Sequence, residues 1–156
     1  MAEDVKRHLE GTDWLSLISF GLFLILLGTV WVATPNLTED IKAFVDPNNW
    51  YLRRVTENIR FPEPEESHPT LYTAAMQFSF IFGVLQIAIL VMRFVFHESI
   101  NRKADTVSGI AFWLSISLFL SMLAREPSIP MFGFLGGIII SGGLALLTSS
   151  FVKLFR

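Results

Sequence analysis

The sequence predicts an all-α membrane protein with four transmembrane helices and a helical, partly amphipathic outer loop between the first two. Four long apolar stretches fill most of the 156 residues, and the first, Trp14 to Ala33, holds no charged residue. The apolar fraction of 52% and the mean hydropathy of +0.52 lie above the usual soluble range. A span needs about 20 apolar residues, and its backbone groups must pair internally, which favours helices.

The four helices are expected over residues 14–33, 71–96, 107–124 and 131–152, in one integral membrane domain, 1–156. The first apolar stretch is longer than the core of a secretory signal, so we expect a retained helix. The third is slightly short for a span, and local thinning of the bilayer or flanking turns would cover the difference. A short turn with two prolines separates the third from the fourth, which predicts that these two form an antiparallel hairpin.

The distribution of Lys and Arg predicts how the chain is oriented. The side that carries both termini and the loop after the second helix holds more Lys and Arg than the opposite side. Arg53 and Arg54, on that opposite side, lie far from the nearest span and count weakly. The rule that positive charge stays inside therefore predicts cytoplasmic termini and an outer loop at 34–70.

Two short amphipathic helices are expected within this outer loop. Residues 36–45 begin with an asparagine and a glutamate in the pattern of a capping box and continue with apolar residues at helical spacing. Leu52, Val55 and Ile59 would share one face of a second helix, which would lie in the membrane interface or cap the helices. The stretch 61–69 is acidic and rich in proline, so we expect it to be extended and solvated.

The fourth apolar stretch carries a small residue at every fourth position. This ladder consists of Gly133, Gly137, Ser141, Ala145 and Ser149, and its first two members form a GxxxG motif. Small residues let membrane helices approach closely. The ladder therefore predicts a packing seam against another helix of this chain or of another copy; the alternative is a pore-lining or sliding face.

The second apolar stretch carries a polar stripe, formed by Ser79, Gly83, Gln86 and Arg93. The Gln86 amide would lie deep in the membrane and needs a partner there, whereas Arg93 lies near the cytoplasmic end and can reach the interface. We expect one interhelical hydrogen bond, for which serines such as Ser117 and Ser121 are candidate partners. The alternative is a polar pathway or a contact with a substrate.

The pattern predicts no catalytic, cofactor-binding or metal-binding residues. There is no cysteine, and the three histidines are not spaced as a set of metal ligands. No nucleophile or phosphate-binding motif is present, and a net charge of −2 argues against a nucleic-acid partner.

These observations favour a protein that acts through protein–protein contact in the lipid bilayer. It would be an accessory subunit of a membrane complex or a self-associating scaffold, with other membrane subunits or a second copy as its partner. The alternative is an oligomeric channel or transporter for ions or small solutes, because four helices enclose little space in a single chain. An enzyme is the least favoured class, since clustered acidic residues and histidines are missing.

Overall fold

Four long helices make up most of the protein. The computed structural model describes residues 14–125 and 131–154, with the long helices α2 (Trp14–Ala33), α4 (Pro69–Val95), α5 (Ile100–Arg125) and α6 (Met131–Leu154). Each contains a segment long and apolar enough to cross a membrane. The predicted mainly helical class with four such helices is confirmed. The turn expected between α5 and α6 lies outside the described residues, as does the polar tail before α2.

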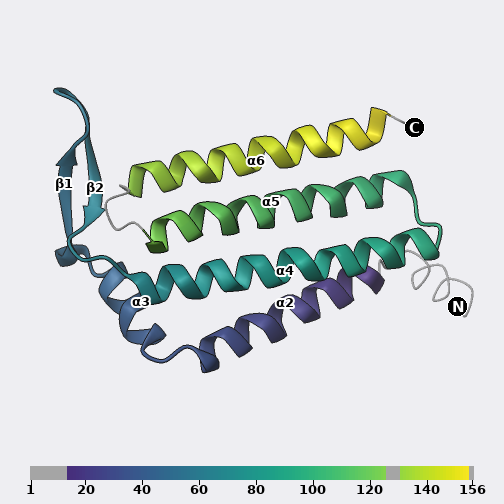
Figure 1. The fold of residues 1–156 in the computed structure, drawn as a ribbon, viewed down its shortest axis with the longest axis horizontal. Coiled ribbons are helices and arrows are strands. Elements are labelled where there is room, and N and C mark those ends of the chain that lie inside the picture. The colour runs from purple at the N-terminus through teal and green to yellow at the C-terminus, as the bar shows by residue number, and fades with distance from the viewer. Residues whose placement is uncertain (1–13, 126–130, 155–156) are drawn as a thin grey trace, which may run out of the picture.

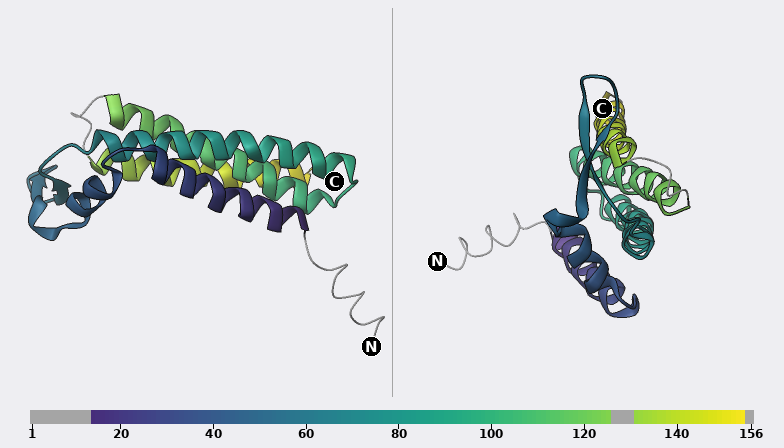
Figure 2. Two further views of the ribbon diagram at one scale, coloured as in Figure 1. Left: turned by 90° about the horizontal axis from the view of Figure 1, so that it is seen from below. Right: turned by 90° about the vertical axis from the view of Figure 1, so that its left-hand side faces the viewer.

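The long helices form an open row (Figures 1 and 2). In this row α2 packs on α4, α4 on α5, and α5 on α6, so α2 and α6 lie at opposite edges. Only 11% to 28% of each membrane-length window is buried inside the chain. The chain itself therefore leaves most of the apolar surface of these helices uncovered.

Two helices begin earlier than the apolar pattern indicates. Helix α5 starts at Ile100 and is 26 residues long, so it extends beyond the apolar stretch at 107–124. Its first two turns carry Arg102, Lys103 and Asp105, and these charged residues lie outside any continuous apolar stretch. Charged side chains nevertheless suit a helix end in the membrane interface. Helix α4 begins at Pro69, because the first helical position needs no donor from its backbone nitrogen.

Residues 34–68, between α2 and α4, correspond to the expected outer loop and are called the outer segment. This segment begins with a short helix, α3 (Leu37–Val45), which packs on α4. The helix is present as predicted, but the expected capping box is not. Asn36 adopts a left-handed backbone conformation, with φ at 61°, and its side chain makes no capping hydrogen bond. Instead, the backbone N–H groups of Glu39 and Asp40 donate to the Asn36 carbonyl oxygen.

The second helix expected in the outer segment is wrong, because a β-hairpin occupies this place. After a short 3-10 turn, η1 (Pro47–Asn49), strands β1 (Trp50–Arg54) and β2 (Arg60–Pro64) pair antiparallel. Aromatic residues favour β1, and the prolines at 62 and 64 in β2 exclude a helix there. The expected solvation of 61–69 is also partly wrong, because His68 is buried at the start of α4.

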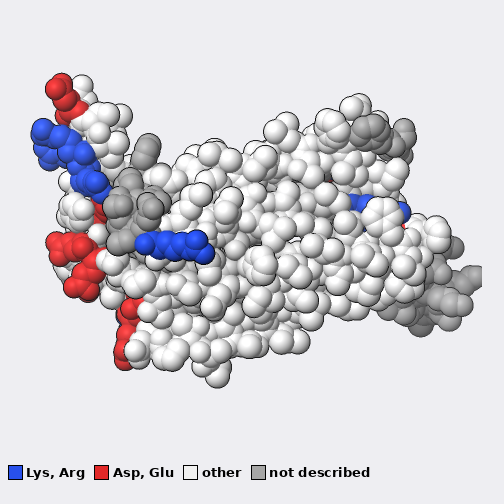
Figure 3. Space-filling model, viewed as in Figure 1, with Lys and Arg blue, Asp and Glu red and all other residues white. Residues whose placement is uncertain are grey.

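Charged side chains mark the two ends of the row (Figure 3). In this view most Lys, Arg, Asp and Glu lie over the outer segment, a few lie at the opposite end, and the middle carries almost none. Helix α2 begins, and α6 ends, at the end opposite the outer segment. The uncharged middle is what helices that cross a hydrocarbon layer require.

Candidate functional site

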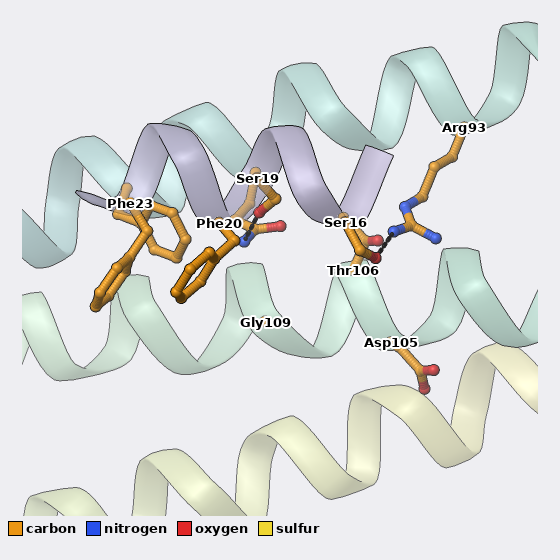
Figure 4. Close-up of a pocket in the computed structure, with 10 residues that line it drawn as sticks. Ser16, Ser19, Phe20, Phe23, Arg93, Asp105, Thr106 and Gly109 are labelled. Atoms are coloured by element: carbon orange, nitrogen blue, oxygen red, sulfur yellow. Dashed lines mark hydrogen bonds between the residues drawn. The ribbon is translucent and has the colours of Figure 1, made fainter. Parts of the chain in front are cut away.

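A crevice of about 370 Å³ lies between α2, α4 and α5, in the half of the row where α2 begins (Figure 4). Polar side chains from all three helices line it: Ser16, Ser19, Gln86, Arg93, Asp105 and Thr106. Aromatic side chains line it as well: Phe20, Phe23 and Phe82. The crevice exists because α2 packs mainly on α4 and leaves space towards α5.

Two hydrogen bonds join α2 to α4 along this crevice. Gln86 Nε2 donates to Ser19 Oγ at 3.1 Å, and Arg93 Nη2 donates to Ser16 Oγ at 3.0 Å. Ser16 and Ser19 are three residues apart and share one face of α2. Gln86 and Arg93 are seven residues apart and share one face of α4. Polar atoms removed from water need such partners. The two bonds therefore fix how α2 is positioned along α4.

Arg93 also belongs to a buried ion pair at the end of the crevice. The residue is only 6% exposed, and its Nη1 lies 2.9 Å from Glu98 Oε2. Glu98 follows α4 in the turn where His97 has a positive φ of 52° and where the Glu98 N–H donates to the Arg93 carbonyl. Arg102 approaches the same carboxylate more loosely, at 3.7 Å. Because the guanidinium and the carboxylate are both buried, each depends on the other.

Aromatic rings fill the space between the helices beyond the crevice. Phe23 of α2 meets Phe82 of α4 edge to face at 5.3 Å, and Phe82 meets Trp113 of α5 in the same manner at 5.2 Å. Phe78 stacks on Phe82 and also contacts Trp113. Such edge-to-face pairs are favourable beyond the area that they bury. The polar lining therefore stops at a packed aromatic cluster instead of continuing towards the outer segment.

The residues of the predicted polar stripe do not form one surface. Ser79 is buried, and a Cβ added to Gly83 would lie 2.8 Å from Leu114 Cδ2, so this part of α4 packs closely on α5. Gln86 and Arg93 instead bind α2. The interhelical hydrogen bond expected for Gln86 is present.

The partner of Gln86 is a serine of α2 and not one of the α5 serines. Ser117 Oγ donates to the Met76 carbonyl of α4, and Ser121 Oγ donates to the Leu118 carbonyl of its own helix. Sequence reasoning missed Ser16 and Ser19, although two hydroxyls one turn apart in an apolar helix are a usable signal.

The middle of the predicted ladder lies against α5. A Cβ added to Gly137 would come within 2.6 Å of Cγ in the Phe119 ring. Ser141 is fully buried and its Oγ donates to the Gly137 carbonyl at 2.8 Å. The Ala145 carbonyl accepts a hydrogen bond from Ser108 Oγ of α5 at 2.9 Å. These three ladder positions therefore form a close contact between helices of the same chain.

The other small residues of α6 make no such close contact with α5. At the ladder ends, Gly133 is exposed and Ser149 is half-buried. A Cβ added to Gly136, Gly142 or Gly143 would meet no heavy atom within 4 Å. The GxxxG pair therefore does not act as a unit inside the chain, and several glycines of α6 face open space.

Within residues 14–125 and 131–154, no three His, Asp or Glu side chains come close enough together to hold a metal ion. Comparison of the chain with models of protein families, with curated proteins and with solved structures finds no match.

Proposed function

We propose that this chain is an integral membrane protein that acts through protein–protein contact, as an accessory subunit of a membrane complex or as a self-associating scaffold. One observation carries this proposal. Both edge helices of the open row carry glycines with open space where a side chain would be. On α2, a Cβ added to Gly21 or Gly28 would meet nothing within 4 Å, and the same holds for Gly136 and Gly143 on α6.

The spacing of these glycines supports an interface with another helix. In each pair the two residues are seven apart, which places them on one face of the helix. Gly136 and Gly143 lie on the side of α6 opposite the seam with α5, and the exposed Ser150 continues this face after seven more residues. A glycine inside a helix costs about 1 kcal/mol relative to alanine, whereas close packing against a second helix uses its small size.

The partner expected at this face is another membrane helix, from a different subunit or from a second copy. Because α2 and α6 lie at opposite edges, an interface at one edge leaves the other edge free. A contact between two α6 helices would give a closed dimer, whereas a contact between α6 and α2 of successive copies would give a ring or a chain.

Gly143→Leu tests the proposed interface. We expect the variant to lose association with its partner or with itself, because a branched side chain would hold the two helices apart. The folded monomer should melt no earlier than the native chain, since a Cβ at this position meets nothing within 4 Å and leucine is a better helix former than glycine. Copurification from mild detergent, cross-linking and thermal melting measure these effects.

Leu144→Phe is the matched control for this test. It adds bulk to an exposed residue of α6 that lies about 100° around the helix from Gly143. We expect association to be retained. If Gly143→Leu associates as the native chain does, the glycine face of α6 is not an interface.

The proposed orientation places both termini in the cytoplasm and the outer segment outside. Cysteines placed at Ser67, in the outer segment, and at Arg102, in the first turns of α5, should then react from opposite sides of sealed vesicles. The native chain has no cysteine and gives no background. We expect an impermeant thiol reagent to label position 67 from the outside. Labelling of both from one side would contradict four spans, and exchanged sides would invert the orientation.

An oligomeric channel or transporter is the second candidate, and the polar crevice between α2, α4 and α5 is the observation that favours it. The aromatic cluster beyond the crevice weighs against a path through one chain, so this function needs several copies. Ion and solute flux into liposomes that contain the purified chain separates the two candidates.

A further inference from the structure

The β-hairpin has two different faces. In an antiparallel pair, residues directly opposite each other point to the same face. Tyr51 and Arg53 of β1 share a face with Glu63 of β2, and both bind its carboxylate: Tyr51 Oη donates to Oε2 at 3.2 Å, and Arg53 Nη1 lies 3.0 Å from Oε1. Partial desolvation and the Glu63 carboxylate raise the pKa of the Tyr51 hydroxyl, which keeps it a donor. The charges on this face are balanced.

The charges on the opposite face are not balanced. Arg54 stands directly opposite Arg60 in the register of the hairpin. Among the described residues, no carboxylate lies within 4.0 Å of either guanidinium, and the ion pairs of Arg53, Arg93, Arg102 and Lys153 involve other cations. Two like charges facing each other across a strand pair destabilise it. An anion bound between the two arginines would remove this cost.

The end of the hairpin combines these cations with exposed apolar side chains. Leu52, Val55 and Ile59 are 63%, 40% and 56% exposed. One carboxylate, that of Glu57, lies in the turn between the strands. An isolated two-stranded hairpin is marginally stable in water, so exposed apolar residues at its end call for a surface to cover them.

The position of the hairpin identifies such a surface. The strands run across the ends of the long helices, just beyond the point where α6 begins, and β2 contacts α6 (Figures 1 and 2). The end of the hairpin projects beyond α6. If the four long helices span a bilayer, this level is the interface between hydrocarbon and headgroups.

We propose that the hairpin binds anionic phospholipid headgroups at this interface. Arg54 and Arg60 bind the phosphate, for which the planar guanidinium is well suited, while Leu52, Val55 and Ile59 enter the boundary between headgroups and acyl chains. Each arginine near an anionic membrane surface adds to the attraction. This contact requires the chain to be in a membrane but does not depend on the proposed helix partners.

A fluorescent label at the end of the hairpin tests the proposal. Ile59→Cys gives a single reactive cysteine in the full chain, which carries an environment-sensitive fluorophore in lipid nanodiscs. We expect the quenching constant of neutral acrylamide to be several-fold lower in discs that contain phosphatidylglycerol than in discs of phosphatidylcholine alone. A label at Thr38→Cys, on an exposed position of α3, should be quenched equally in both.

Two further variants make the result specific to the arginine pair. In Arg54→Gln with Arg60→Gln, the difference between the two lipids should disappear, and the melting temperature should not fall, because two opposed like charges are removed. In Arg54→Lys with Arg60→Lys, the charge and most of the difference should remain. Equal quenching of the Ile59→Cys label in both lipids would overturn the proposal. So would a lipid dependence that survives in the glutamine variant.

Discussion

Arg93→Leu should lower the free energy of unfolding by about 3 kcal/mol, because removal of one partner from a buried ion pair costs about 3–5 kcal/mol. The Glu98 side chain is only 10% exposed, and its carboxylate would lose the guanidinium that lies 2.9 Å away. Ser16 would also lose its bond to α4. Thermal and denaturant unfolding of the purified chain in detergent measure the effect.

Arg102→Leu is the matched control for Arg93→Leu. Arg102 approaches the same Glu98 carboxylate, but at 3.7 Å and with a side chain 40% exposed. Exposed ion pairs contribute about 0–1 kcal/mol, so this variant should cost little. Glu98→Leu added to Arg93→Leu should restore part of the stability, because no uncompensated charge then remains buried. Equal destabilisation by the two arginine variants would contradict the role given to burial.

The long helices were predictable because the signal for each is summed over many residues. In α2 and α4, continuous apolar composition over a membrane's thickness leaves a helix as the only way to pair every backbone group. The early start of α5 was missed because Arg102, Lys103 and Asp105 lower its hydropathy without preventing a helix. Hydropathy indicates which part of a helix is expected to lie in lipid, and α5 extends beyond that part.

The hairpin was missed because strand pairing depends on residues distant in the sequence. Leu52, Val55 and Ile59 match the spacing of one helix face, and over such a short segment this match is weak evidence. What decides the structure is the pairing of β1 with a strand that contains Pro62 and Pro64. The two prolines indicate an extended segment, whereas the spacing of the apolar residues before them is also compatible with a helix.

The candidate site was predictable only in part. Gln86 was expected to need an interhelical partner because a buried amide must be hydrogen-bonded, and it has one. That the partner is Ser19 depends on which helices are neighbours and how they are aligned, which local patterns do not report. The crevice itself results from the way α2 packs on α4 rather than α5. The ladder likewise predicted close packing without indicating which helix it meets.

Gly137→Leu should destabilise the monomer itself by about 1–3 kcal/mol, the usual cost of overpacking. Even the first added carbon would lie 2.6 Å from the Phe119 ring, so the ring must move or α5 and α6 must separate. The loss should appear as a lower melting temperature of the purified chain. Ile139→Leu is the control, since Ile139 is 75% exposed and should tolerate the exchange.

A second substitution distinguishes local overpacking at Gly137 from a general effect of bulk on α6. Phe119→Ala combined with Gly137→Leu should recover part of the stability, because residues in contact do not contribute independently. Gly143→Leu adds the same side chain to the opposite side of α6, where an added Cβ meets nothing within 4 Å, and should not lower the melting temperature. If Gly137→Leu instead leaves the melting of the monomer unchanged and alters only its association, the ladder packs between chains and not against α5. If both leucine variants melt early by the same amount, the cause is added bulk on α6 in general and not the contact with Phe119.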